Sequence, residues 1–238
     1  MRLNIYERID KYYQVLELSK SGYSCPEISR ELNLSYKLVY GWLHYKKKPW
    51  KVSPDFEKQD ALAYSLGVLW GRSFKDYGRL ALTTKHKVFA LSFLKALETI
   101  KIHGWLNRLQ INGKEYYCVT FYSVQFLKWL KSISVSEANE LCKNYSVEFL
   151  RGFFESHGGI HRRKAQNGKY YPFLLFAKSN PEILKFVRNL LFRLGYHPTE
   201  ITGHQNHLFY LSRKDEVSKF LNQVKPVINN KIGMVRIE

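Results

Sequence analysis

The chain is poor in cysteine and has no long apolar run. Cys25, Cys118 and Cys142 are the 3 cysteines among 238 residues, and no Cys-x-x-Cys pair occurs. This argues against a disulfide framework and against a zinc site. A membrane span needs roughly 18 consecutive apolar residues, and no segment approaches that length. The N-terminus resembles neither a secretory signal nor a transit peptide, so we expect a cytoplasmic protein that does not contact a membrane.

Acidic residues are also scarce. The sequence has 20 Asp and Glu against 38 Lys and Arg, a net charge of +18, and the basic excess is spread along the chain rather than collected in a tail. The positive electrostatic field of such a chain favours a polyanionic partner, and the 16% aromatic content makes nucleic acid the leading candidate. An ordinary basic surface is the alternative. The hydrophobic content of 45% indicates a globular chain with one large core or two small ones.

Residues 1–52 have the pattern of three short helices. Residues 10–20 carry an apolar helical stripe, Ser24 and Glu27 predict a capping box at the start of a second helix, and Ser35 predicts the cap of a third helix over residues 36–43. Three short helices with a tight second turn are typical of a helix-turn-helix, whose last helix enters the DNA major groove.

A run of basic residues follows this third helix and can neutralise phosphates beside it. A small helical interaction module with a solvated linker is the alternative. Ser53-Pro54 then predicts a hinge to the rest of the chain. The predicted DNA-binding residues of this part are Tyr36, Lys37, Tyr40, His44, Lys46, Lys47, Lys48 and Lys51.

The remainder of the chain predicts one pattern twice, over residues 58–145 and 146–238. The order is α-β-β-α-β-β-α in each repeat, and Asn112-Gly113 and Asn167-Gly168 are strong hairpin signals. In the first repeat the predicted elements are 61–71, 73–77, 79–85, 87–99, 105–111, 115–122 and 124–131. In the second they are 147–157, 159–166, 169–178, 181–194, 197–202, 208–212 and 214–224.

Each repeat opens on a similar apolar helix with small residues four positions apart. Residues at i and i+4 share a helix face, so small side chains there let a second backbone approach closely. We therefore expect the two helices to pack on each other, which brings Arg72 and His157 at their C-terminal ends together. The predicted helix-pair packing residues are Gly67, Gly71, Gly152 and Ser156.

These motifs, the duplication and the charge resemble the LAGLIDADG homing endonucleases, particularly single-chain archaeal and intein forms, over roughly residues 58–232. The resemblance implies an α+β fold, a pseudo-twofold saddle of two sheets over DNA, here preceded by the helix-turn-helix domain. It also implies one metal-binding acid at the eighth position of each motif. Those two positions are Arg72 and His157 in this chain.

Neither residue suits the family's chemistry, because Mg²⁺ prefers hard oxygen ligands and lowers the pKa of the attacking water. Arg72 is always cationic with no lone pair to offer, and His157 suits transition metals better than Mg²⁺. Glu155, at the sixth position, is the remaining acid of either motif, but it points about 100° around the helix from the eighth, and we expect it to pair with Arg151 or another base. We therefore predict no catalytic residue, no metal and no cofactor, with Mg²⁺ required only if the protein is an endonuclease.

Arg72 and His157 are instead interpreted as DNA-binding residues that replace the metal's positive charge, with surface drift in an inactive relative as the alternative. Polar residues that alternate along the strands are the candidate groove readers. In the first repeat they are Lys75, Arg79, Lys85, Arg108, Gln110 and Lys114. In the second they are His161, Arg162, Arg163, Lys164, Gln166, Lys169, Lys178, His204 and Asn206.

The sequence thus predicts a monomeric, nucleoid-associated protein that binds double-stranded DNA in a sequence-specific way and acts as a regulator without cutting. A family of bacterial developmental regulators joins a decayed saddle of this kind to a helix-turn-helix, which is an analogy at the level of the fold. One alternative is an active endonuclease or nickase that uses Glu155 with another acid such as Asp76. A second alternative is binding of RNA, for instance intron RNA.

Overall fold

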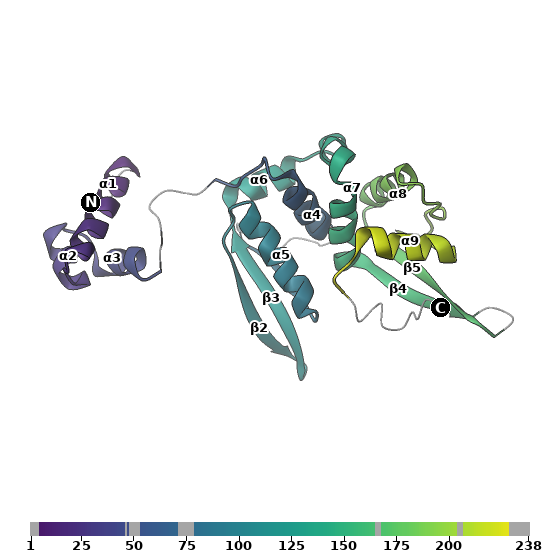
Figure 1. The fold of residues 1–238 in the computed structure, drawn as a ribbon, viewed down its shortest axis with the longest axis horizontal. Coiled ribbons are helices and arrows are strands. Elements are labelled where there is room, and N and C mark those ends of the chain that lie inside the picture. Colours follow the sequence, from purple (N-terminus) through teal and green to yellow (C-terminus); the bar gives the residue numbers. More distant parts are fainter. Residues whose placement is uncertain are drawn as a thin grey trace. The chain divides into compact units, whose positions relative to one another are not determined.

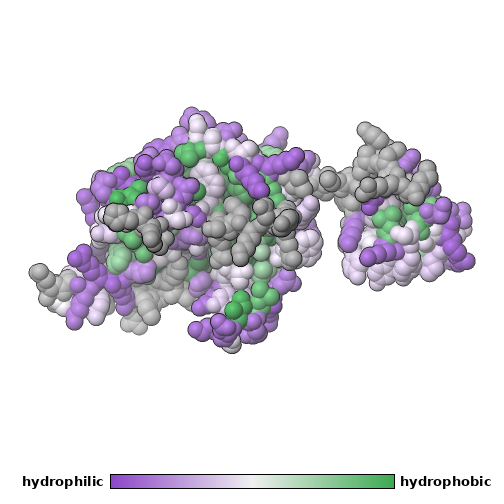
Figure 2. Space-filling view, turned by 180° about the vertical axis from the view of Figure 1, so that it is seen from behind, coloured by the Kyte–Doolittle hydropathy of each residue, from purple (hydrophilic) through white to green (hydrophobic). Residues whose placement is uncertain are grey.

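The computed structural model describes residues 5–45, 47, 53–70, 79–164, 168–203 and 207–228. The chain divides into two compact units, residues 1–52 and residues 53–238, which are drawn in Figure 1. On the face seen in Figure 2, the described surface is mostly hydrophilic with small scattered hydrophobic groups. In the part of the chain that is described, no helix has the length and apolar character to span a membrane.

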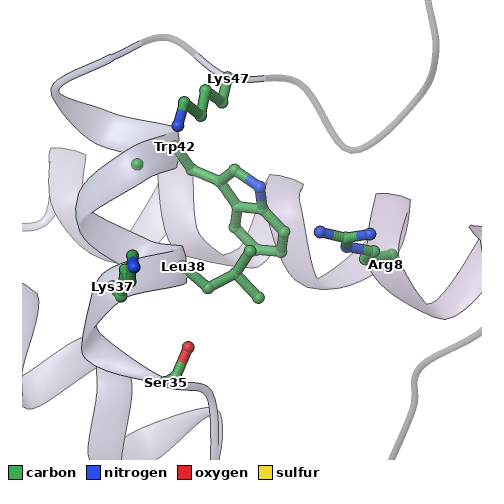
Figure 3. Close-up of a pocket in the computed structure, with 7 residues that line it drawn as sticks. Arg8, Ser35, Lys37, Leu38, Trp42 and Lys47 are labelled. Carbon is green, nitrogen blue, oxygen red and sulfur yellow. The ribbon is translucent and has the colours of Figure 1, made fainter. Parts of the chain in front are cut away.

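The first unit consists of three helices around a small core. Its capping box is confirmed: the backbone N–H of Ser24 donates to Glu27 Oε2 at 2.7 Å. Trp42 points from the third helix toward the first (Figure 3), where its ring lies 5.6 Å from that of Tyr12. The helices are α1 (Ile5–Lys20), α2 (Cys25–Glu31) and α3 (Tyr36–Leu43).

The first half of the second unit follows the predicted order where it is described. Its strands form an antiparallel sheet in the order β1-β3-β2. Asn112 and Gly113 turn the β2–β3 hairpin with φ values of 50° and 71°, as the Asn-Gly signal predicts. The predicted strand 73–77 lies outside the described residues. The elements are α4 (Gln59–Trp70), β1 (Arg79–Thr84), α5 (Lys87–Thr99), β2 (Gly104–Ile111), β3 (Lys114–Tyr122) and α6 (Val124–Ser132).

The second half contains a second antiparallel sheet in the order β4-β5-β6. The predicted strand 197–202 forms no regular strand, but part of it bonds to β6 as predicted: Thr202 pairs with Leu208 through an isolated bridge, and the backbone N–H of Thr199 donates to the carbonyl oxygen of Tyr210 at 3.0 Å. The segment before it passes over α9, where the backbone N–H of His197 donates to Glu216 rather than to a strand. The elements are α7 (Val135–His157), β4 (Gly158–Lys164), β5 (Tyr170–Lys178), α8 (Pro181–Arg193), β6 (His207–Leu211) and α9 (Lys214–Val224).

Helix α7 is about twice as long as the predicted helix 147–157. It begins at a second capping box, in which Ser134 and Glu137 bond reciprocally, and it bends at Tyr145, whose φ/ψ of −122° and 32° are not helical. The straight segment after this bend is the one that packs against α4.

Each sheet has a helix-side face, which packs on the helices, and an open face. The helix-side face of the first sheet meets α5, where the Phe93 and Phe121 rings lie 5.8 Å apart. In the second sheet it meets α9, with the rings of Phe176 and Phe220 also 5.8 Å apart. Because side chains alternate along a strand, the register fixes which predicted reader lies on which face.

Candidate nucleic-acid interface

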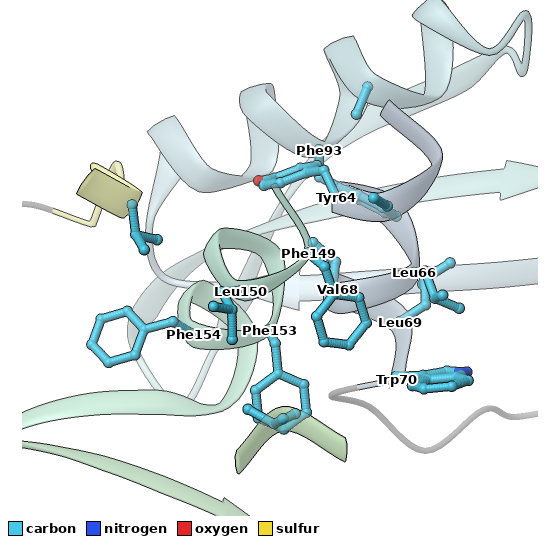
Figure 4. Packing of buried hydrophobic residues seen from close by; sticks show 14 of the residues in the cluster. Tyr64, Leu66, Val68, Leu69, Trp70, Phe93, Phe149, Leu150, Phe153 and Phe154 are labelled. Carbon is cyan, nitrogen blue, oxygen red and sulfur yellow. The ribbon is translucent and has the colours of Figure 1, made fainter. Parts of the chain in front are cut away.

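Figure 4 shows the buried side chains of α4 and α7, among them Val68 and Phe149. The two helices pack on each other at two glycines, each of which contacts the backbone of the other helix. A Cβ atom on Gly67 would overlap the carbonyl oxygen of Phe149, and one on Gly152 would overlap the carbonyl oxygen of Tyr64. Gly67 and Gly152 are 85 residues apart, and so are Tyr64 and Phe149, so the two contacts are related by the internal repeat. Only glycine allows backbones to approach this closely.

Glu155 lies in the core beside this crossing and is 3% exposed. The Tyr64 hydroxyl of α4 donates to Glu155 Oε2 at 2.6 Å, and the backbone N–H of Val227 donates to Oε1 at 2.7 Å. Burial raises the pKa of Glu155, although both hydrogen bonds and the charge of Arg151 act to lower it. Burial also raises the pKa of Tyr64. The carboxylate therefore joins α4, α7 and the segment after α9.

The expected pairing of Glu155 with Arg151 was wrong. The Arg151 guanidinium lies over the Tyr64 ring, 5.1 Å from its centroid, and the carboxylate is already engaged by two donors. Arg151 precedes Glu155 by one helical turn, but the acid side chain turns into the core, where the long-range partners Tyr64 and Val227 are available.

The repeat relates Glu155 to Trp70 and Tyr64 to Phe149. Trp70 packs edge-on against Phe149, with ring centroids 5.9 Å apart and an interplanar angle of 84°. The sixth motif position of each helix thus packs on the residue three positions before the glycine of the other helix. One of these two contacts is a hydrogen bond and the other is aromatic.

In the first sheet the predicted readers divide between the two faces. Lys85 lies near the open face, with Nζ 5.5 Å from the centroid of the Tyr116 ring, and Lys114 follows the same alternation. Arg108 and Gln110 pair with Tyr117 and Glu115 on the helix-side face, which contradicts a single reading face for all of them. The backbone of Arg79 belongs to the open-face alternation.

The second sheet divides its basic residues in the same way. The register puts His161 and Arg163 on the open face and Arg162, Lys164 and Lys178 on the helix-side face. The basic run 162–164 is therefore split by the pleat and does not form one patch. Lys169 precedes β5 and is exposed.

An aromatic row crosses the open face of this second sheet. His161 stacks on Phe173 with ring centroids 5.5 Å apart, and Phe173 contacts Tyr210 at 5.8 Å. Sequence reasoning missed Phe173 and Tyr210, because only charged and amide side chains were considered as readers. Their alternation in β5 and β6 is the signal that would have found them.

Residues 144–225 match the family model described as a LAGLIDADG-like domain. This segment is similar to that family over about a third of the chain. The fold resembles that of the N-terminal LAGLIDADG domain of DUF199/WhiA, at 16% identity and a TM-score of 0.55 over 72% of this chain and 85% of that one. No curated protein sequence matches the chain.

Two homing endonucleases have the same fold. Mesophilic variants of I-DmoI are 18% identical with a TM-score of 0.50, over 70% of this chain and 89% of that one. The homing endonuclease I-WcaI, solved bound to its DNA recognition sequence, is 16% identical with a TM-score of 0.53, over 82% of this chain and 92% of that one. At these identities the likeness establishes the fold alone.

The divalent metal implied by this fold does not fit the end of α7. His157 is half-buried with its ring 6.2 Å from that of Phe153, and Glu155 is turned into the core. Within the described ranges, no group of three or more His, Cys, Asp or Glu side chains is placed to hold a metal ion. Ser156, which we expected at the helix-pair contact, is half-buried and donates from Oγ to the carbonyl oxygen of Phe153 at 3.0 Å.

In the first unit, three predicted contacts form an aromatic ladder on one face of α3. The Tyr36 and Tyr40 rings lie 5.7 Å apart, and Tyr40 stacks on His44 at 4.2 Å. Lys37 is exposed on α3, and Lys47 is exposed just after it. The residues Lys46, Lys48, Lys51, Gly71, Arg72, Lys75, Asp76, Gln166, His204 and Asn206 lie outside the described residues, and so does the side chain of Arg79.

Proposed function

We propose that the chain is a monomeric, cytoplasmic, nucleoid-associated protein that binds double-stranded DNA sequence-specifically and regulates it without cutting. The observation that carries the loss of cleavage is the position of Glu155. A carboxylate that is buried and accepts two hydrogen bonds at 2.6 and 2.7 Å cannot also hold Mg²⁺ at a phosphate without breaking the core. The acid that survives in the motifs is thus explained by packing.

DNA as the partner is supported by charge and by fold. The chain carries a net charge of +18. Lys114, His161 and Arg163 belong to the open faces of the two sheets, and Lys85 lies beside the open face over Tyr116. A neighbour of the same fold, I-WcaI, was solved bound to its DNA recognition sequence. Phosphate neutralisation by such side chains supplies affinity, and base contacts on the same faces supply sequence preference.

A helix-turn-helix in the first unit is the second part of the proposal. The ladder Tyr36, Tyr40 and His44, of which Tyr36 and His44 are exposed and Tyr40 is half-buried, runs along α3 to its C-cap. This is the third of the three helices, where a recognition helix carries its base contacts. Two linked binding units gain avidity if the linker lets both engage one duplex.

Selection of bound fragments from random duplexes tests this function. The full chain is expected to enrich two motifs, one of which disappears when residues 1–52 are removed. Enrichment of no motif at all would mean that binding is non-specific and would contradict the proposal.

RNA binding is the second candidate, and the row His161, Phe173 and Tyr210 favours it. Aromatic rings on an open sheet face can stack unpaired bases, which a regular duplex does not offer. Competition between the selected duplex and structured RNA at one salt concentration separates the two. We expect the duplex to compete better, and a clear preference for RNA would replace the DNA proposal.

A further inference from the structure

A cleft of about 570 Å³ lies between α1 and α3 in the first unit (Figure 3). Arg8 reaches it from α1, Lys37 from the first turn of α3, and Lys47 from the segment after α3. Trp42 and Leu38 form its apolar wall. Ser35 and Gly41 complete the lining.

The described lining of this cleft contains three cations and no acid. In the described part of the chain, no carboxylate lies within 4.0 Å of the charged groups of Arg8, Lys37 or Lys47. Three like charges around one space repel each other, and an anion between them removes that repulsion. The Lys47 ammonium lies 5.4 Å from the centroid of the Tyr45 ring, so its printed partner is an aromatic face rather than an acid. What distinguishes the cluster is that its three cations line one cleft whose described lining has no acid.

The cleft is built on fixed parts of the unit. Trp42 is 3% exposed and is held by the edge of Tyr12 at 5.6 Å. The backbone N–H of Lys47 donates to the carbonyl oxygen of Gly41 at 3.1 Å, and this bond ties the segment after α3 to the helix. The side chains of Arg8, Lys37 and Lys47 are exposed and can turn toward an incoming group.

We propose that this cleft binds a phosphate group, and that in the DNA complex the group is a backbone phosphodiester beside the bases that α3 reads. This proposal rests on the proposed function. It adds Arg8 to the predicted DNA-binding residues, which in this unit came from the third helix and the basic run after it. The guanidinium fork of Arg8 can bond two phosphate oxygens, and the two lysines add point charges. The Tyr36, Tyr40 and His44 ladder lies on a neighbouring face of the same helix, as a groove contact beside a backbone contact requires.

The test compares two variants of the full chain that each lose one positive charge on α1. Arg8→Gln removes a cleft residue, and Lys20→Gln is the control at the far end of the helix. Both residues are exposed, so both variants are expected to melt like the wild type, which circular dichroism checks. Dissociation constants for the selected duplex are then measured between 50 and 200 mM salt.

Arg8→Gln is expected to reduce the slope of log K against log salt by about 0.9, the value of one phosphate contact. Its affinity defect should therefore shrink roughly threefold over that salt range, with an unchanged sequence preference, because a backbone contact carries no base information. Lys20→Gln is expected to match the wild type. If the wild type binds DNA and Arg8→Gln behaves as the control does, the cleft proposal is overturned while the proposed function stands.

A second arm distinguishes free phosphate from DNA and also applies if the chain binds no duplex. The full chain is labelled with 5-fluorotryptophan, the Trp42 resonance is assigned from Trp42→Phe, and inorganic phosphate or adenosine monophosphate is titrated in. A Trp42 shift that saturates and is lost in Arg8→Gln supports a phosphate site in either case. If neither the duplex nor these anions moves the Trp42 resonance, the cleft binds no phosphate and the inference fails.

Discussion

The two ends of the α4–α7 pair fill equivalent positions with different chemistry. At one end Trp70 packs edge-on against Phe149 with centroids 5.9 Å apart, and at the other Glu155 accepts a 2.6 Å hydrogen bond from Tyr64. Both contacts lie between the reciprocal glycines and the motif ends. If Glu155 were a remnant of a metal site, its counterpart Trp70 would have no reason to occupy the same place. The comparison indicates that the sixth motif position is a packing position in both repeats.

Removal of Trp70 is expected to have the largest effect on this comparison. Trp70→Ala deletes a buried indole that contacts Phe149 and Phe186, and we expect a loss of about 3–5 kcal/mol in the free energy of unfolding. Urea denaturation followed by circular dichroism measures it. Trp105→Ala is the matched control, because that indole is 51% exposed and its loss should cost within about 0.5 kcal/mol. Equal losses in the two variants would contradict a stabilising role for Trp70 in the core.

A larger side chain at the glycine crossing is expected to give the second-largest loss in the free energy of unfolding. Gly152→Ala puts a methyl group against the carbonyl oxygen of Tyr64, and helix backbones cannot separate without losing contacts on both sides, so we expect a cost of about 3 kcal/mol. Gly41→Ala is the control, since its Cβ would meet only the Lys47 side chain at 3.6 Å. A Gly152→Ala protein as stable as the wild type would contradict the crossing.

Uncharged substitutions at the Tyr64–Glu155 hydrogen bond are expected to reduce the free energy of unfolding by less. In Glu155→Gln the amide oxygen still accepts from Tyr64, but its NH₂ group cannot accept from Val227, and one unsatisfied buried group costs about 1–3 kcal/mol. Tyr64→Phe places the residue type found at the equivalent Phe149, and it leaves Glu155 Oε2 without its donor. We expect a similar loss in the free energy of unfolding.

The double variant Tyr64→Phe with Glu155→Leu makes both ends apolar. The loss in the free energy of unfolding should be smaller, by about 1 kcal/mol, than the sum of the losses of Tyr64→Phe and Glu155→Leu made singly. The reason is that the double variant leaves no buried polar group at the Tyr64 side. Additive costs would mean that Tyr64 and Glu155 do not act as a pair.

The smallest effect concerns pH. Burial raises the pKa of Glu155 above its ordinary value of 4.5, so between pH 4.5 and the folded pKa the folded state binds more protons than the unfolded state. The contribution of Glu155 to stability is therefore full below pH 4.5 and is lost as the pH rises through the folded pKa. The stability of the wild type relative to Glu155→Gln should fall over that window. A relative stability that rises with pH would show that hydrogen bonding outweighs burial.

Local signals predicted many elements well. Helices α3, α5 and α9 begin and end at the predicted residues, because caps and apolar periodicity are written within a few positions of each boundary. The start of α7 was missed although Ser134 and Glu137 carry the same capping signal that was used at Ser24. The first half of α7 is polar and lacks the apolar spacing that predicts a helix.

The candidate site was less predictable because it depends on distant residues. The partners of Glu155 lie 91 and 72 positions away in the chain, so sequence offered only the adjacent Arg151. The face of each basic strand residue depended on register, which separates Arg163 from Arg162 and Lys164. Arg8 could have been found, since it lies one helical turn before the core residue Tyr12 and so faces α3.

The most direct test of the central claim is a nicking assay on a supercoiled plasmid that carries the selected site. Wild type and Glu155→Gln are compared at saturating protein with Mg²⁺ and with Mn²⁺, and a gel shift verifies binding in each lane. The account predicts that both proteins bind the site and that the plasmid stays supercoiled. A site-specific nick made by the wild type and absent with Glu155→Gln would contradict it, since the buried carboxylate would then have to leave the core to hold metal.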